Sequence, residues 1–128
     1  MTSGNAFPKS ARVVAGTQFT RALRNGAVAS DDTLVVFALA TQGEAVRLGV
    51  TIPKKTGNAV KRNHWKRLIR ESFRQCQHEL PRGYDLVVRP KRGAVADHTK
   101  IQRGLPTLAR KAVRRDRDSA RQSNSKTR

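Results

Sequence analysis

The side chains that could do chemistry in this sequence are cations, and they gather between positions 54 and 74. In the stretch KKTGNAVKRNHWKRLIRESFR almost every charged residue is Lys or Arg, and Glu71 is the only acid. Charges of one sign repel one another, so such a segment is disfavoured unless an outside partner supplies negative charge. Arg grips phosphate through paired hydrogen bonds, and Asn can contact a base edge or a sugar. This stretch therefore predicts the binding of a polyanion.

A helical spacing separates these cations from the apolar residues of the same stretch. At ~3.6 residues per turn, each residue advances by about 100° around a helix. The apolar sector then holds Trp65, Leu68, Ile69, Phe73 and Cys76. An adjacent sector, called the basic sector below, holds Asn63, Lys66, Arg67, Arg70 and Arg74. We expect the apolar sector to pack on a sheet with Trp65 buried. A merely solvated face usually mixes both signs of charge, which this one does not.

The overall composition favours the same class of partner. The chain has 128 residues, which predicts one domain, and its 27 Lys and Arg against 9 Asp and Glu give a formal charge of +18. Such a field attracts nucleic acid, with an anionic membrane or an acidic protein as alternatives. The start MTSGNAFPKS lacks the apolar core of a signal peptide, and the run TLVVFALA is too short to span a bilayer.

The other reactive side chains do not form a catalytic or metal-binding pattern. The three histidines have no ligand spacing. Asp31 and Asp32 fit a hairpin turn better than a metal site. Cys76 is the only cysteine, so no intrachain disulfide can form, and no base is evident beside it. We expect no catalytic residue and no metal ligand in the protein, and a cytoplasmic location.

The elements that would position the basic stretch can be read from periodicity and caps. After a flexible lead-in over 1–10, we expect a helix over 11–26, strands over 33–40, 45–53 and 84–90, and a helix from the cap Asn58 to about residue 79. The first two strands are expected to pair as an antiparallel hairpin.

A further helix is expected at the end of the domain. It should begin after Asp97 or His98 and run toward residue 115, and Pro106 should kink it or delay its start. Residues 116–128 are polar and charged, which predicts a disordered basic tail.

The stretch RLGVTIPKKTGNAVKRNHWKRLIRESFR, residues 47–74, closely resembles the signature of the bacterial ribonuclease P protein subunit. FPKSARVVAGTQFTRALRNG is similar to that family's N-terminal helix, and GYDLVVRP to its last strand. The resemblance covers roughly residues 7–113. It implies an α+β fold for the domain at 11–115. This is a two-layer α/β sandwich with about four strands, in which the basic helix makes a left-handed βαβ crossover.

The resemblance also implies a function. The family's protein joins a catalytic RNA, and the complex removes the 5′ leader from precursor tRNA to give mature tRNA 5′ ends. The RNA carries the Mg²⁺-dependent chemistry and binds most of the Mg²⁺, while the protein alone holds no tightly bound cofactor. The protein binds the leader in a cleft between its sheet and its N-terminal helix.

Site residues follow from the resemblance by position. The RNA-binding motif falls on Lys54, Lys55, Asn58, Arg62, Asn63, Lys66, Arg67 and Arg70. The leader cleft falls on Phe19, Val35 and Phe37, although on the residues alone the two Phe fit core positions better. His64 stands where the family usually has Arg, and Leu23 where it often has Phe.

Two other classes stay open on the sequence alone. A structural RNA-binding protein of ribosomal type would share this charge and size. A DNA-binding protein would be expected to show helix-turn-helix or β-ribbon order, and neither is evident. The RNA that co-purifies with the protein would separate the three.

Overall fold

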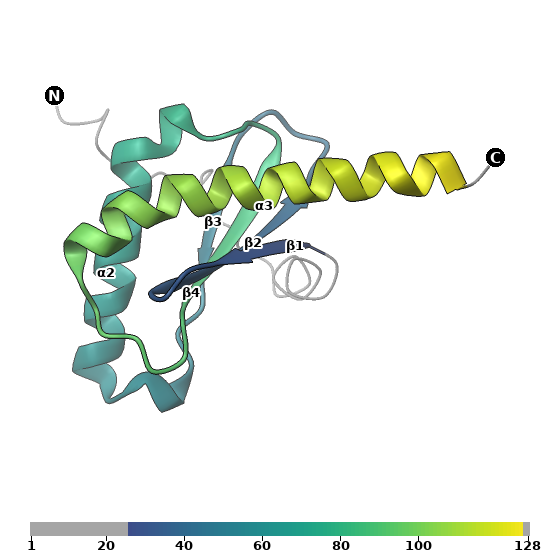
Figure 1. The fold of residues 1–128 in the computed structure, drawn as a ribbon. Coiled ribbons are helices and arrows are strands. Elements are labelled where there is room, and N and C mark those ends of the chain that lie inside the picture. The colour runs from purple at the N-terminus through teal and green to yellow at the C-terminus, as the bar shows by residue number, and fades with distance from the viewer. Residues whose placement is uncertain (1–25, 127–128) are drawn as a thin grey trace, which may run out of the picture.

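The computed structural model describes residues 26–126, which form four strands, two short 3-10 helices and two long helices (Figure 1). In chain order these are β1 (Ala27–Ser30), β2 (Leu34–Ala40), β3 (Arg47–Val50), η3 (Lys54–Thr56), α2 (Ala59–Cys76), η4 (Gln77–Glu79), β4 (Tyr84–Pro90) and α3 (His98–Lys126). The lead-in, the expected N-terminal helix up to residue 25 and Phe19 lie outside the described residues.

The strands form one mixed sheet in the order β1-β2-β4-β3. β4 is antiparallel to β2 and parallel to β3. The expected hairpin between β2 and β3 is therefore wrong, because β4 lies between them. β4 is buried over five consecutive residues, which suits a central strand, whereas β3 is an edge strand with half-buried residues at both its ends. Local periodicity marked both strands but carried no information about their partners.

β1 was not anticipated, and it supplies the hairpin partner of β2. The turn between them is held by Asp31, whose Oδ1 accepts hydrogen bonds from the backbone N–H groups of Thr33 and Leu34, both at 2.8 Å. This confirms the turn role expected of the Asp31-Asp32 pair. The strand Ala27–Ser30 has only four residues and two of them are Ala, so its β signal is weak.

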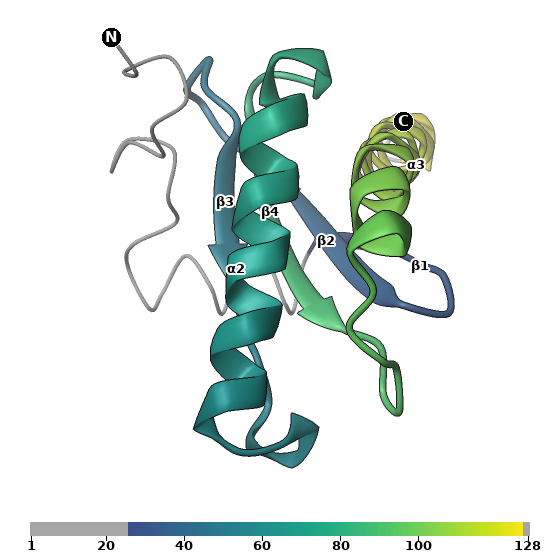
Figure 2. The ribbon, with the colours of Figure 1, turned by 90° about the vertical axis from the view of Figure 1, so that its left-hand side faces the viewer.

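Both long helices cover the same face of the sheet (Figure 2). Seen from the α2 side with β3 and β4 running downwards, β4 lies to the right of β3, so the β3-α2-β4 crossover is left-handed (Figure 2). The core between the layers is built from side chains of both helices and one face of the sheet, among them Trp65, Phe73, Leu105, Val36 and Leu86. The four-stranded α+β sandwich is thus confirmed.

α2 begins at the predicted residue and buries the predicted sector. Asn58 is the N-cap, and its Oδ1 accepts a hydrogen bond from the Lys61 N–H at 3.0 Å. All five residues of the apolar sector are buried, and Trp65 is 3% exposed. The helix therefore lies on the sheet through its apolar sector and presents the basic sector outward.

α3 is longer than expected, and Pro106 does not delay its start. It starts where predicted, with Asp97 accepting from the Lys100 N–H at 3.0 Å, but it continues through Pro106 without delay. Burial of Ile101, Leu105 and Leu108 on both sides of the proline outweighs its one missing hydrogen bond.

The helix also includes residues 116–126, where composition predicts an unstructured tail. Asp116 and Arg117 contact the body of the domain, because Asp116 accepts from the Tyr84 hydroxyl at 3.2 Å and Arg117 lies 5.8 Å from the Tyr84 ring centre. Gly and Pro are absent from this segment, so nothing in its backbone stops the helix.

Candidate nucleic-acid interface

The basic sector of α2 forms the first cationic surface. Asn63, Arg67 and Arg70 are exposed, and Lys66 and Arg74 are half-buried. The single acid nearby, Glu71, lies 3.9 Å from Arg67, too long for a strong ion pair. The charge of the sector is thus left almost uncompensated, and the helix holds its side chains at fixed spacing.

Arg62 sits at the edge of the basic sector and carries an unpaired donor. Its Nε is buried, and within the described residues it has no hydrogen-bond partner. A buried unpaired N–H costs about 1–3 kcal/mol, more when the group is charged. Rotation of the Arg62 side chain would expose this N–H, and a phosphate oxygen that accepted its hydrogen bond would remove the cost.

The approach to α2 adds two more cations at its N-terminal end. Lys54 and Lys55 are exposed on η3, and the helix N-terminus beside them attracts anions. Gly57 makes this turn possible, since its φ is 154° and a Cβ there would meet the Lys61 side chain at 2.8 Å. The side-chain Oδ1 of Asn58 accepts the cap hydrogen bond, which leaves the side-chain amide N–H groups for a partner.

A shallow hollow of about 390 Å³ opens among the first turns of α2. Val60, Asn63, His64 and Arg67 line it, and Val60 is 76% exposed. An exposed valine among cations offers an apolar contact that a nucleobase or ribose can use. His64 stands here where an Arg was expected by family likeness.

The second face of the sheet, opposite α2 and α3, carries the expected leader residues. Val35 and Phe37 alternate with the core residues of β2 and therefore project from this face, as does Val87 opposite Phe37. Val35 is 7% exposed and Phe37 is half-buried. The guanidinium of Arg89 lies 5.4 Å from the centre of the Phe37 ring, a cation–π distance.

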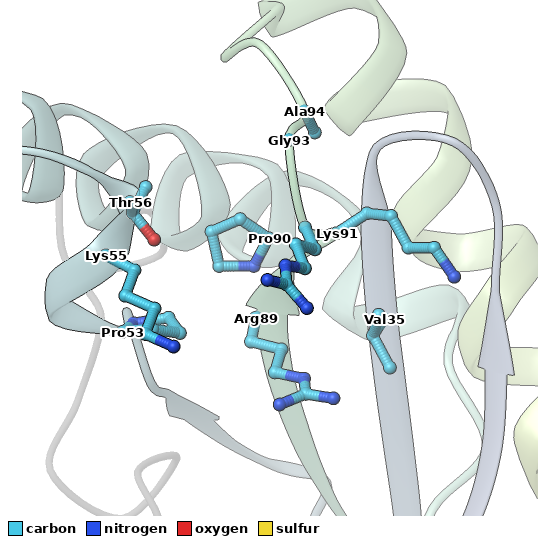
Figure 3. Close-up of a pocket in the computed structure, with 10 residues that line it drawn as sticks. Val35, Pro53, Lys55, Thr56, Arg89, Pro90, Lys91, Gly93 and Ala94 are labelled. Atoms are coloured by element: carbon cyan, nitrogen blue, oxygen red, sulfur yellow. The ribbon is translucent and has the colours of Figure 1, made fainter.

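A cleft of about 620 Å³ lies at the end of this face (Figure 3). It is lined by Val35, Pro53, Lys55, Thr56, Arg89, Pro90, Lys91, Arg92, Gly93 and Ala94, and it is called the basic cleft below. Figure 3 shows Lys55, Arg89 and Lys91 coming from η3, β4 and the loop after β4. Four of the lining residues are cations and none is an acid. Phe37 is on the same face but does not line the cleft.

Three cations of the cleft were missed by the sequence reasoning. Arg89, Lys91 and Arg92 belong to the run RPKR at 89–92, which spans the end of the strand predicted over 84–90 and the residues directly after it. The signal was there, since this run places basic residues directly after a buried strand. The run lies at the same cleft as Lys55 because β3 and β4 are parallel neighbours, and the sequence alone did not show this neighbourhood.

The described residues give no support for nucleophilic catalysis or metal binding by the other reactive side chains. Burial raises the pKa of the Cys76 thiol from its ordinary 9.0 to about 11, so it is protonated and a poor nucleophile near neutral pH. Within residues 26–126, no group of three or more His, Cys, Asp or Glu side chains is placed to hold a metal ion. What the site offers chemically is phosphate and base binding.

Comparison with known proteins agrees with this geometry. The family model described as Ribonuclease P matches residues 7–117. The chain belongs to the ribonuclease P protein family. The ribonuclease P protein component of Chlamydia felis is 42% identical over 89 residues, covering 68% of this chain and 63% of that relative. That of Desulforapulum autotrophicum is 29% identical over 112 residues, covering 87% of this chain and 96% of the relative.

Solved structures of ribonuclease P proteins share the fold. The Staphylococcus aureus protein superposes with a TM-score of 0.72 at 29% identity, covering 81% of this chain and 96% of that one. The Thermotoga maritima protein gives a TM-score of 0.70 at 28% identity, covering 77% of this chain and 96% of that one.

Family membership places the chain in a ribonuclease holoenzyme. Its role is that of the family, tRNA 5′ processing together with an RNA subunit, and the ribosomal alternative is not favoured. No helix among the described residues is long and apolar enough to cross a membrane.

Proposed function

We propose that the two cationic surfaces serve two RNAs. The basic sector, with Arg62, Asn58 and the η3 lysines, binds the catalytic RNA subunit. The face of the sheet opposite α2 and α3, together with the basic cleft, binds the 5′ leader of precursor tRNA. By holding both, the protein assists the Mg²⁺-dependent cleavage that gives mature tRNA 5′ ends.

One observation carries this proposal, the placement of Lys54 and Lys55 between the two surfaces. η3 precedes α2 directly, and Lys55 also lines the basic cleft. A continuous cationic path therefore runs from the cleft around η3 to the N-terminus of α2. Such a path lets one small domain contact a substrate strand and a second RNA at once. It also explains why the cations stay unpaired in the protein alone, since phosphates neutralise them on binding.

The chemistry itself we assign to the RNA subunit, together with most of the Mg²⁺. Mg²⁺ prefers carboxylate, carbonyl, water and phosphate oxygens, and the protein surface at the cleft is lined by cations that repel it. The protein's contribution is to lower phosphate repulsion between the two RNAs and so to favour Mg²⁺ binding by them. A cytoplasmic location accords with a single cysteine that is buried and reduced.

The test is reconstitution of the protein with the ribonuclease P RNA subunit at low Mg²⁺. Addition of protein should strongly raise the rate of precursor tRNA cleavage at the mature 5′ end, and it should tighten precursor binding more than mature tRNA binding. A protein that leaves both quantities unchanged, or that co-purifies with ribosomal RNA instead, would overturn the proposal.

A further inference from the structure

A third cationic surface, on α3, is used by neither of the contacts proposed above. Arg103, Arg110 and Arg114 are all exposed. At about 100° per residue they fall within a sector of about 40° on the helix. They make a straight line about 16 Å long at ~1.5 Å rise per residue, called the arginine row below. The row lies opposite the buried side of α3, which contains Ile101, Leu105, Ala112 and their neighbours.

The arginine row is separate from the basic sector of α2. Gln75 and Gln102 join the two helices, with the Gln102 Nε2 donating to the Gln75 Oε1 at 2.6 Å. By helical spacing Glu71 and His64 share a sector of α2 with Gln75, and this sector lies beside the basic sector on the side where Gln75 contacts α3. A neutral to acidic strip thus divides the two surfaces on the same helical layer.

The row is not neutralised within the protein. Among the described residues, Arg103, Arg110 and Arg114 have no acidic side chain within ion-pair distance. The only acids of α3 are Asp116 and Asp118, and Asp116 turns inward to Tyr84. A solvated helix face normally carries acids three or four residues from its cations. Among the described residues only Asp118, four residues after Arg114, stands in such a position, and it makes no ion pair with Arg114.

The chemistry of the row selects a phosphate backbone. All three charges are Arg, whose planar guanidinium binds phosphate through paired hydrogen bonds. A protein interface would need apolar or aromatic residues at its centre. The exposed large apolar side chains of the described residues are Val28, Val60 and Val95, and none is on α3. The same lack of a stacking surface disfavours single-stranded RNA, whose bases bind by stacking.

We infer that the arginine row is a second contact to the RNA subunit, made to the phosphate backbone of one of its double-stranded segments. This inference rests on the proposed function. The RNA subunit is favoured over precursor tRNA because the row shares the helical layer with the basic sector, whereas the basic cleft opens at the sheet. A rigid line of cations fits the regular phosphates of a duplex strand and reads no sequence.

The experiment compares affinities of protein variants for the ribonuclease P RNA subunit over a range of salt. Arg110→Gln with Arg114→Gln should weaken binding about tenfold at low salt and make the slope of log K against log salt shallower by about 1.5, since each phosphate contact contributes ~0.7–0.9. The matched control is Arg82→Gln, which removes one charge from an exposed turn. It should change the affinity less than twofold and leave the slope unchanged.

A charge-conserving pair separates specific contact from general attraction. Arg110→Lys with Arg114→Lys should recover part of the affinity but not the backbone protections that footprinting assigns to the row. If the double Gln variant loses no more affinity per charge than Arg82→Gln, the inference is overturned. It is also overturned if only precursor tRNA binding to the assembled holoenzyme suffers. Failure of the proposed function looks different, because Arg67→Ala would then leave assembly unchanged as well.

Discussion

Arg47 and Asp85 face each other across the parallel pair of β3 and β4, and the Nε and Nη2 atoms of Arg47 donate to the two carboxylate oxygens at 2.6 and 2.7 Å. The hydrogen bond to Asp85 raises the pKa of Arg47 above its usual range. The pair joins the first and last strands of the left-handed crossover. It therefore fixes the register of β3 against β4, and this register places Lys55 and Arg89 at the same cleft.

Breaking this pair should be strongly and unequally destabilising. The Asp85 side chain is 3% exposed and the Arg47 side chain 26% exposed, so Arg47→Met leaves a buried charge whereas Asp85→Leu leaves one that water can reach. We expect Arg47→Met to lower the free energy of unfolding by about 3–5 kcal/mol and Asp85→Leu to lower it by less. Urea unfolding of both variants and of the double variant measures the difference. Equal costs for the two single variants would contradict this account.

Alkaline pH should destabilise the fold through Cys76. Its folded-state pKa is about 11 because burial disfavours the thiolate, while the unfolded thiol has its ordinary value of 9.0. The raised pKa means that the thiol contributes stability below about pH 8.5, and that this contribution is lost as the pH rises toward 11. The total loss is about 2–3 kcal/mol at ~1.4 kcal/mol per pH unit.

The control for this prediction is Cys76→Ala, which lowers stability through its cavity but removes the titration. Burial also raises the pKa of Tyr84, which adds a loss of the same sign in both proteins. The difference between the pH profiles of wild type and variant therefore isolates Cys76. Parallel profiles between pH 8 and 11 would show that the thiol does not titrate as described.

The parts that sequence reasoning predicted are those decided by local geometry. The α2 helix follows from one apolar sector and from Asn58, whose cap bond reaches only three residues along the chain. Trp65 is buried as expected because helical spacing alone places it with Phe73. The same spacing exposes Arg67 and Arg70.

The parts it missed are those decided by contacts distant in the sequence. Besides β1, β2 pairs with β4, some fifty residues away, and nothing local distinguishes this pairing from a hairpin with β3. The basic cleft depends on the same long-range pairing, since it joins Lys55 to Arg89. In α3, the sequence shows the hydrogen bond that Pro106 removes. It does not show the stabilising burial of Leu105 and Leu108, which depends on the folded sheet.

Binding of the RNA subunit should depend steeply on salt and on Arg67. With about six phosphates neutralised, log K should fall against log salt with a slope of roughly −4 to −5. Arg67→Ala should weaken assembly or slow cleavage at low Mg²⁺, and added Mg²⁺ should restore part of the loss because it replaces positive charge. Arg82→Ala, at an exposed turn, is the control for general charge. A flat salt dependence, or a loss that Mg²⁺ leaves untouched, would contradict a phosphate contact here.

Phe37 should contribute to binding of the leader and not to binding of the rest of the precursor tRNA. It is half-buried on the face of the sheet opposite α2 and α3 with Arg89 over its ring, so a nucleobase can stack on the ring or on the guanidinium that covers it. Phe37→Ala should weaken precursor tRNA binding by the reconstituted holoenzyme by about 1–3 kcal/mol, the size of one lost stack. Mature tRNA lacks the leader, so its affinity should be nearly unchanged.

Leu39→Ala is the matched control for Phe37→Ala, because Leu39 lies on the same strand and face, is half-buried and does not line the basic cleft. Its effect on the two affinities should be small and equal. Emission of Trp65, the only tryptophan, reports whether each variant stays folded, since a buried indole emits at shorter wavelength than a hydrated one. If Phe37→Ala shifts this emission to that of a hydrated indole, or weakens both tRNAs equally, then Phe37 stabilises the fold and the leader contact must be sought among the cations of the cleft alone.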